Sequence, residues 1–306
     1  MRSRYPRIHL ERITGLFGKS RQGYYDRIRS EKDEEEIRRK VVELVKGIRK
    51  LMPKIGIRKM HYKLAEVFER KGIKVGRDKL FDILREEGLL VLKRRRGKWT
   101  TNSKHWLRKY SNLIKDMKID APNKVWVSDI TYINIEEGFN YLSLITDAYS
   151  KKILGQHLSR TLEAEGCLIA LRKAIKTCEK KEGIIHHSDR GIQYCSKDYV
   201  ETLMNNGMWP SMIDDGNVYE NAIAERVNGI LKEEFGIGEG FKDHSEANKY
   251  INQSIDIYNN ERPHLSCGML TPEQAHNSEG PLMKLWKNYP HKYANKNKNL
   301  EQLLTC

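Results

Sequence analysis

Three acidic residues occupy positions typical of functional groups: one within a strand pattern, one at a strand end and one on a helix. Asp129 interrupts the otherwise apolar strand pattern over 125–133. Asp189 ends the run Ile184-Ile185-His186-His187-Ser188-Asp189 at the beginning of a loop, and Glu225 lies in a helical pattern. A strand aspartate is costly to bury unless it binds a metal or satisfies a buried polar group. Strand tips are also where α/β sheets place ligand groups. Three converging carboxylates repel one another unless cations lie between them, so their chemistry would be metal-assisted.

The ion that best suits such a site is Mg²⁺, with Mn²⁺ as the alternative. Mg²⁺ takes oxygen ligands and binds through one or two carboxylates plus a substrate phosphate. Two ions about 3.5–4 Å apart would stabilise the attacking and the leaving oxygen of an in-line displacement. Asn228 or Gly229, and then Lys232, follow Glu225 on the same helix face, so this face could also offer a phosphate contact.

The elements expected around these residues form a mixed α/β core. Antiparallel strands precede alternating strands and helices, which favours a sheet covered by helices. The expected strands are 125–133, 141–146, 153–158, 183–187 and 210–213, and the expected helices are 162–180, 196–206, 221–235 and 244–258. Thr271-Pro272-Glu273-Gln274 predicts a capping box at the beginning of a further helix.

The charge of +15 is concentrated in the N-terminal third of the chain. Residues 1–120 carry 35 Lys+Arg against 16 Asp+Glu, and the remainder carries 21 against 25. Such segregation indicates a nucleic-acid partner rather than mere solubility. A helix is expected over 34–52. Two more, near 60–68 and 80–84, are separated by the break 71–76 and predict a helix-turn-helix unit, although any small helical bundle shows this pattern.

Basic residues in this third are the expected DNA contacts. Arg77 and Lys79 lie off the apolar stripe of the second helix of the unit, facing a DNA groove. A basic run with interleaved tryptophans follows, suited to phosphates and unstacked bases. Its cations are Lys93, Arg94, Arg95, Arg96 and Lys98. The alternative is a solvated basic linker whose tryptophans cover neighbouring surface.

Several classes of protein are excluded by composition. Residues 1–60 contain no long apolar run, so we expect neither a signal peptide nor a membrane anchor. We therefore expect the protein to be cytoplasmic and associated with the nucleoid. The five cysteines stand far apart without a CxxC pair, which indicates reduced thiols rather than a disulfide framework or a zinc site. His186 and His187 suit packing or DNA contact better than magnesium.

Four blocks occur in a fixed order along the chain. They are Trp126–Tyr132, His187–Gly191 with Gln193-Tyr194, Asn221-Ala222 leading to Glu225, and Tyr258-Asn259 leading to Arg262-Pro263-His264. Over roughly residues 124–275 they resemble the signature blocks of second-frame (OrfB-type) transposases of the IS-three family of insertion sequences. The cores of these proteins are similar to retroviral integrases and ribonuclease H. Glu220 departs from the family, which usually has aspartate there.

The resemblance implies a ribonuclease H-like (integrase-type) α/β core behind a helical N-terminal region. It implies that Asp129, Asp189 and Glu225 are the catalytic, metal-binding DDE triad and that Lys232 contacts DNA near the active site. The expected activity is cleavage and strand transfer at the ends of an insertion sequence. The expected partners are element ends, target DNA, further copies of the chain on DNA, and an upstream-frame DNA-binding product or a fusion with it.

The expected domains are a helical region over 1–52, a helix-turn-helix domain over 53–91, a basic linker over 92–121, the core over 122–275 and a tail over 276–306. Two rival functions stay open at this point. One is a ribonuclease H-like nuclease that cleaves without strand transfer, and the other is a non-catalytic DNA-binding regulator.

Overall fold

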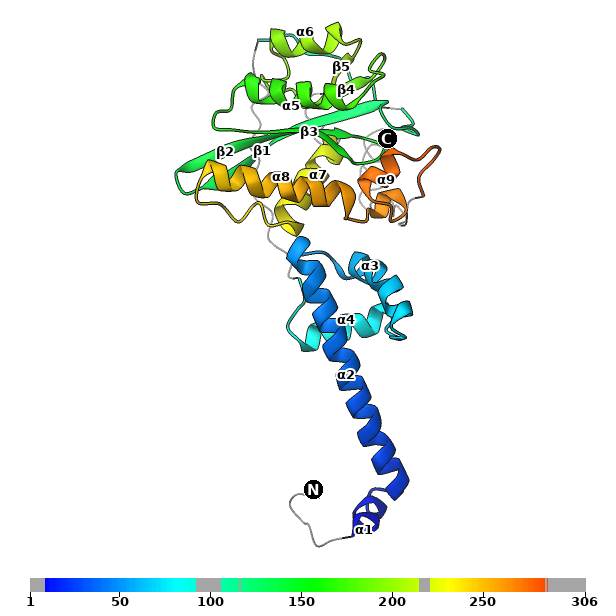
Figure 1. Ribbon diagram of the computed structural model, residues 1–306. Coiled ribbons are helices and arrows are strands. Elements are labelled where there is room, and N and C mark those ends of the chain that lie inside the picture. The colour runs from blue at the N-terminus through cyan, green and yellow to red at the C-terminus, as the bar shows by residue number, and fades with distance from the viewer. Residues whose placement is uncertain (1–8, 92–105, 116, 215–220, 284, 286–306) are drawn as a thin grey trace, which may run out of the picture. The chain divides into compact units, whose positions relative to one another are not determined.

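The computed structural model describes residues 9–91, 106–115, 117–214, 221–283 and 285. The chain forms two compact units, Met1–Arg94 and Arg95–Cys306 (Figure 1). The basic run Lys93, Arg94, Arg95, Arg96 and Lys98 lies outside the described residues. Among the described helices, none combines the length and the apolar character that crossing a membrane requires.

The N-terminal unit is helical. Its helices are α1 (Leu10–Gly15), α2 (Arg21–Leu51), α3 (Ile57–Arg70) and α4 (Arg77–Glu86). Val41 and Val45 of α2, Leu64 of α3 and Leu80 and Leu84 of α4 are almost fully buried and form its apolar centre. The two helices flanking the break at 71–76 are thus present as the sequence predicts.

Helix α2 begins well before the predicted start at residue 34. The side chain of Ser20 caps it by accepting a hydrogen bond from the backbone N–H of Gly23 at 3.0 Å. Ion pairs one turn apart, such as Arg27 with Glu31 at 2.8 Å, support its exposed first half. That half lacks a continuous apolar stripe, so hydrophobic periodicity alone predicted only the second half.

The second unit is built on a five-stranded sheet with the order β3-β2-β1-β4-β5. Its strands are β1 (Val125–Ile135), β2 (Gly138–Asp147), β3 (Ile153–Ser159), β4 (Ile185–Ser188) and β5 (Trp209–Met212). β1, β2 and β3 pair antiparallel, whereas β4 pairs parallel with both β1 and β5. This mixed topology is the ribonuclease H-like arrangement that the sequence predicts.

Helices cover both faces of the sheet. Helices α5 (Ala164–Thr177) and α6 (Lys197–Asn205) lie on one face, and α7 (Ala222–Glu234), α8 (His244–Asn260) and α9 (Pro272–His276) on the other (Figure 1). Trp126 of β1 packs in the cluster that contains residues of α5 and α6, whereas its neighbour Val127 packs with Ala224 of α7. Side chains alternate along a strand, so Asp129 shares the face of Val127 and is directed towards α7.

The segment before β1 packs against the second unit. Leu107 and Tyr110 pack against the cluster on the α5 and α6 side, and Ile114 and Ile119 against the cluster on the α7 side. Between them, the backbone N–H of Leu113 donates to the Ser211 hydroxyl of edge strand β5 at 2.9 Å. This part of the expected linker therefore lies across the β5 edge of the sheet.

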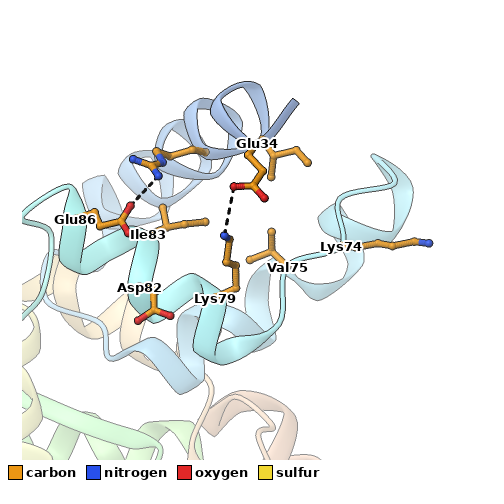
Figure 2. A pocket seen from close by; sticks show the side chains of 9 residues that line it. Glu34, Lys74, Val75, Lys79, Asp82, Ile83 and Glu86 are labelled. Atoms are coloured by element: carbon orange, nitrogen blue, oxygen red, sulfur yellow. Dashed lines mark ion pairs between the residues drawn. The ribbon is translucent and has the colours of Figure 1, made fainter. Parts of the chain in front are cut away.

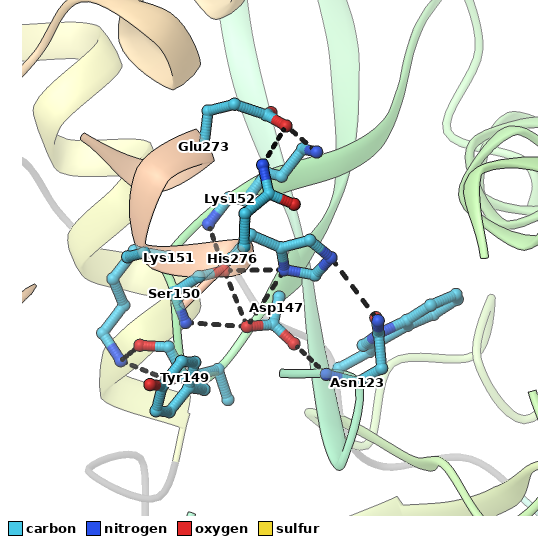
Figure 3. A network of polar contacts seen from close by, with 12 residues as sticks. Asn123, Asp147, Tyr149, Ser150, Lys151, Lys152, Glu273 and His276 are labelled. Carbon is cyan, nitrogen blue, oxygen red and sulfur yellow. Dashed lines mark hydrogen bonds and ion pairs between the residues drawn. The ribbon is translucent and has the colours of Figure 1, made fainter. Parts of the chain in front are cut away.

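A buried polar network fixes the beginning of β1 (Figure 3). Asp147, at the end of β2, accepts hydrogen bonds from the N–H and hydroxyl of Ser150 at 2.7 Å each and from the backbone N–H of Asn123 at 2.8 Å. His276 of α9 lies 3.8 Å from the same carboxylate. Burial raises the pKa of Asp147, but the bonds from His276 and Ser150 lower it more, so the carboxylate stays charged. It thereby joins three separate chain segments.

Candidate active site

Asp129 lies in the middle of the central strand and is held by two hydrogen bonds. The side-chain amide of Asn228, on α7, donates to one carboxylate oxygen at 2.8 Å. The backbone N–H of Ile130 donates to the other at 2.9 Å. The side chain is half-buried, and both bonds favour its charged form.

Asp189 follows β4 directly, as the sequence predicts for a strand-tip residue. One carboxylate oxygen accepts a hydrogen bond from the backbone N–H of Gly191 at 2.9 Å, which shapes the loop. The side chain of the next residue, Arg190, donates to the carbonyl oxygen of Ile213 at 2.9 Å, beyond the end of β5. Because β4 pairs parallel with β1, Asp189 emerges beside the strand that carries Asp129.

Glu225 lies exposed in the first turn of α7, and the three carboxylates influence one another. Burial, then the charge of Asp189, and more weakly that of Glu225, raise the pKa of Asp129 to about 7, against the bonds from Asn228 and Ile130. Partial burial and the charge of Asp189 raise the pKa of Glu225. Mutual repulsion of this kind requires that the three groups share one region.

These carboxylates do not form a closed metal site. Within the ranges that the structure describes, no three Asp, Glu, His or Cys side chains are grouped so that they could hold a metal ion. The donor set nevertheless suits a hard cation, because it consists of oxygens whose repulsion a cation would relieve. Glu225 is the exposed member, so its side chain has the freedom to adopt another rotamer.

Lys232 lies two turns beyond Glu225 on α7 and is half-buried. Burial lowers the pKa of its ammonium group, and the negative charge of Asp129 opposes that shift. The lysine therefore lies within electrostatic reach of Asp129. A cation here is placed to attract a phosphate that approaches the carboxylates.

Helix α7 is attached to the rest of the core near both ends. At its N-terminal end the side-chain amide of Asn221 donates to the carbonyl oxygen of Ser128 at 3.0 Å. At its C-terminal end Glu234 receives two hydrogen bonds from the guanidinium of Arg262, each 2.9 Å long. Arg262 is only 2% exposed, so it packs inside the protein.

Sequence reasoning missed these anchoring contacts. Asn228 was expected on the face of Glu225, but its bond to Asp129 spans 99 residues of chain. A polar residue three positions after a candidate ligand is a signal for such an orienting contact, although periodicity cannot name its partner.

The two histidines before Asp189 are packed inside the sheet. The ring of His186 bonds the Tyr199 hydroxyl at 2.9 Å, and that of His187 bonds the Ser211 hydroxyl at 2.9 Å. Burial, followed by the neighbouring His187, lowers the pKa of His186 to about 3. His186 is thus a neutral core residue, in line with the packing role that the sequence favours.

In the N-terminal unit, Arg77 and Lys79 lie in the first turn of α4 with acidic neighbours. Arg77 contacts Asp78 at 2.9 Å, and Lys79 reaches Glu34 of α2 at 3.9 Å (Figure 2). The groove beside Lys79 has a volume of about 230 Å³. Both basic side chains remain more than half exposed, at 56% and 57%, and such exposed pairs are weak.

Comparison with known proteins identifies the class of the core. The family described as "Integrase core domain" matches residues 119–218, and a second family of the same description matches residues 206–272. The matched range contains all three carboxylates. The integrase catalytic core domain of HTLV-2, solved in complex with magnesium in a trimeric form, is similar over 51% of this chain and 98% of that chain, with 17% identity and a TM-score of 0.42.

Relatives of similar length narrow the class. A 31 kDa protein of insertion element IS600 from Shigella sonnei is 36% identical to this chain. The alignment covers 84% of this chain and 94% of that protein. The transposase InsF of insertion sequence IS3A from Escherichia coli (strain K12) is 34% identical over 63% of this chain and 68% of its own length. The chain therefore belongs to the insertion-sequence transposases with an integrase core domain.

Proposed function

We propose that this transposase cleaves and joins DNA strands at one site formed by Asp129, Asp189 and Glu225, which bind Mg²⁺ or Mn²⁺, with two ions present during the reaction. The observation that carries the proposal is geometric: β4 pairs parallel with β1, so Asp189 emerges beside Asp129, and Asn228 of the helix that carries Glu225 donates a hydrogen bond to Asp129 at 2.8 Å. Three groups from β1, the end of β4 and α7 thus act on one another. The oxygen-only donor set supports a hard divalent cation.

The residues around the carboxylates have separate tasks in this proposal. Bound cations would stabilise the charge that develops on the reacting phosphodiester. Asn228 orients Asp129, and Lys232 attracts a phosphate of the DNA strand. Water attacks the phosphodiester at the element's end as the bond to the leaving 3′-oxygen breaks. The released 3′-hydroxyl then attacks a target phosphodiester in line and displaces the 3′-oxygen of the target strand, so no covalent enzyme intermediate is required.

The proposal extends to DNA contacts outside the core. Arg77 and Lys79 contact DNA phosphates or bases from α4, where the weak pairs with Asp78 and Glu34 can exchange for phosphate. The basic run over 93–98, with Lys93, Arg94, Arg95, Arg96 and Lys98, contacts the backbone. The protein acts as a homo-oligomer on element ends and target DNA, alone or with an upstream-frame product fused to it.

The test compares Glu225→Gln with Glu233→Gln. Both variants remove one negative charge from α7, and Glu233 is an exposed glutamate of the same helix. Each protein is incubated with labelled element ends, target DNA and Mg²⁺, and cleaved and joined products are separated. E225Q should lose cleavage and joining while it retains DNA binding, and E233Q should behave like the parent protein. Unchanged joining by E225Q would refute the triad.

The same assay separates the rival functions. Cleavage without joined products from the parent protein would favour a ribonuclease H-like nuclease. DNA binding without cleavage, with either metal, would favour a non-catalytic regulator. Joined products that require Asp129, Asp189 and Glu225 together support the transposase mechanism.

A further inference from the structure

The segment that crosses the edge of the sheet carries an unusually exposed aromatic residue. Trp106 is 91% exposed, whereas Leu107 and Tyr110 are anchored on the apolar cluster below. An indole in water is unfavourable, because removing its apolar surface from water stabilises a protein. A tryptophan this exposed on an anchored segment is available for contact with a partner.

Two exposed cations, Arg108 and Lys109, follow this tryptophan closely in the sequence. The guanidinium of Arg108 lies over the ring of Tyr110, 5.2 Å from its centroid, so Tyr110 holds the arginine at the surface. Lys109 is exposed beside it. No aspartate or glutamate occurs from Gly88 to Lys115. The partner that fits an exposed indole between cations is nucleic acid, through base stacking and phosphate contacts.

The position of the segment connects it to the candidate active site. Leu107 and Tyr110 pack against the cluster that contains Tyr194 and Cys195, which follow Asp189 in the loop after β4. The charge of Lys109 lowers the pKa of Cys195, although burial raises it more. The pKa of Tyr194, raised chiefly by burial, is raised further by the charges of Asp189 and Asp129. The segment over 106–110 is therefore anchored on the apolar cluster that also contains residues of this loop.

We propose that Trp106 stacks on an unpaired base of the DNA that this transposase binds, with Arg108 and Lys109 on the adjacent phosphates. The bases of an intact duplex are already stacked on one another, so the site selects DNA with an unpaired tail over blunt duplex. This inference rests on the proposed function in one respect: the nucleic acid that binds is taken to be the DNA on which the transposase acts.

The test measures binding without catalysis. Full-length protein is titrated in EDTA with two labelled duplexes of equal paired sequence, one blunt and one with a short unpaired tail. The variants are Trp106→Ala, Trp106→Phe and, as the matched control, Trp209→Ala, which removes another exposed tryptophan from β5. Fluorescence anisotropy gives each dissociation constant, and circular dichroism verifies the fold.

W106A should bind the tailed duplex roughly tenfold more weakly while its affinity for the blunt duplex stays unchanged, because one base-stacking contact is lost. W106F should recover most of the affinity, and W209A should match the parent protein. Equal affinities of W106A and the parent for the tailed duplex would overturn the inference, as would an equal loss for both duplexes. A changed oligomeric state of W106A with unchanged DNA binding would assign Trp106 to a contact between copies instead. Since EDTA prevents strand cleavage, failure of the triad in the E225Q assay would leave this measurement unaffected.

Discussion

The side-chain amide of Asn228 donates a 2.8 Å hydrogen bond to Asp129 and thereby connects helix α7 to the central strand. The two residues come from α7 and β1 and lie 99 residues apart in the chain. The remaining side-chain oxygen of Asn228 is buried without a hydrogen-bond partner among the described residues. The amide therefore serves one acceptor, Asp129, and its removal should affect this carboxylate first.

We predict that Asn228→Leu, close to asparagine in size, lowers the rate of strand cleavage by about tenfold to a hundredfold, because a hydrogen bond to a charged group contributes about 1.5–3 kcal/mol. Affinity for element-end DNA should stay within experimental error of the parent protein. Cleavage rates at saturating DNA and Mg²⁺ provide the measurement. The control is Asn260→Leu at the exposed end of α8. Equal cleavage by N228L and the parent would show that Asp129 needs no orientation by α7.

The buried pair of Arg262 and Glu234 gives a prediction for stability. Arg262→Met alone should lower the free energy of unfolding by about 3–5 kcal/mol, because it leaves the Glu234 charge without its partner. The double variant R262M/E234M should recover most of this loss, since both charges are then removed. Urea unfolding with a common m-value measures the parent protein, R262M, E234M and the double variant.

The control for this cycle is Lys197→Met, in the exposed ion pair with Glu201 on α6. That change should alter the free energy of unfolding by less than about 1 kcal/mol. If the two single changes at Arg262 and Glu234 simply added in the double variant, the pair would not hold α7 as described.

Acid should destabilise the core through His186. Its folded pKa of about 3 lies below the ordinary value of 6.5, because burial and His187 disfavour the charged ring. As the pH falls, the His186 ring therefore becomes protonated in the unfolded chain before it does so in the folded protein. The stability that the neutral ring contributes is complete above pH 6.5 and is lost progressively towards pH 3. Between pH 6 and 4 the free energy of unfolding should fall more steeply in the parent than in His186→Gln, by up to about 1.4 kcal/mol per pH unit. Urea unfolding at a series of pH values checks this, and parallel pH profiles of the two proteins would contradict it.

The strands, the helices of the core and the positions of the candidate carboxylates follow from local patterns in the sequence. Apolar runs predicted β1 to β5, and the capping box beginning at Thr271 is present with both of its hydrogen bonds. Each carboxylate has the setting predicted for it: Asp129 within a strand, Asp189 after a strand and Glu225 on a helix. Their roles as metal ligands stay a prediction.

Long-range partners are not encoded in such patterns. Periodicity shows which face Asn228 occupies, but not that Asp129 faces it, and it cannot pair Arg262 with Glu234. The early beginning of α2 escaped prediction for another reason: helix propensity and ion pairs, rather than an apolar stripe, sustain its first half. The DNA contacts expected over 93–98 fall outside the described residues, so they too remain predictions.

The pairing of β1 with β2 runs from Trp126 opposite Asp147 to Ile135 opposite Gly138 without interruption. Adjacent strand residues face opposite sides of a sheet, so a shift of one residue would exchange the two sides of β1. Asp129 would then face the hydrophobic core between the sheet and α5. A neighbour such as Ser128 would face α7 instead. A single inserted or deleted residue in this hairpin would thus erase the chemistry even in a protein that still folds.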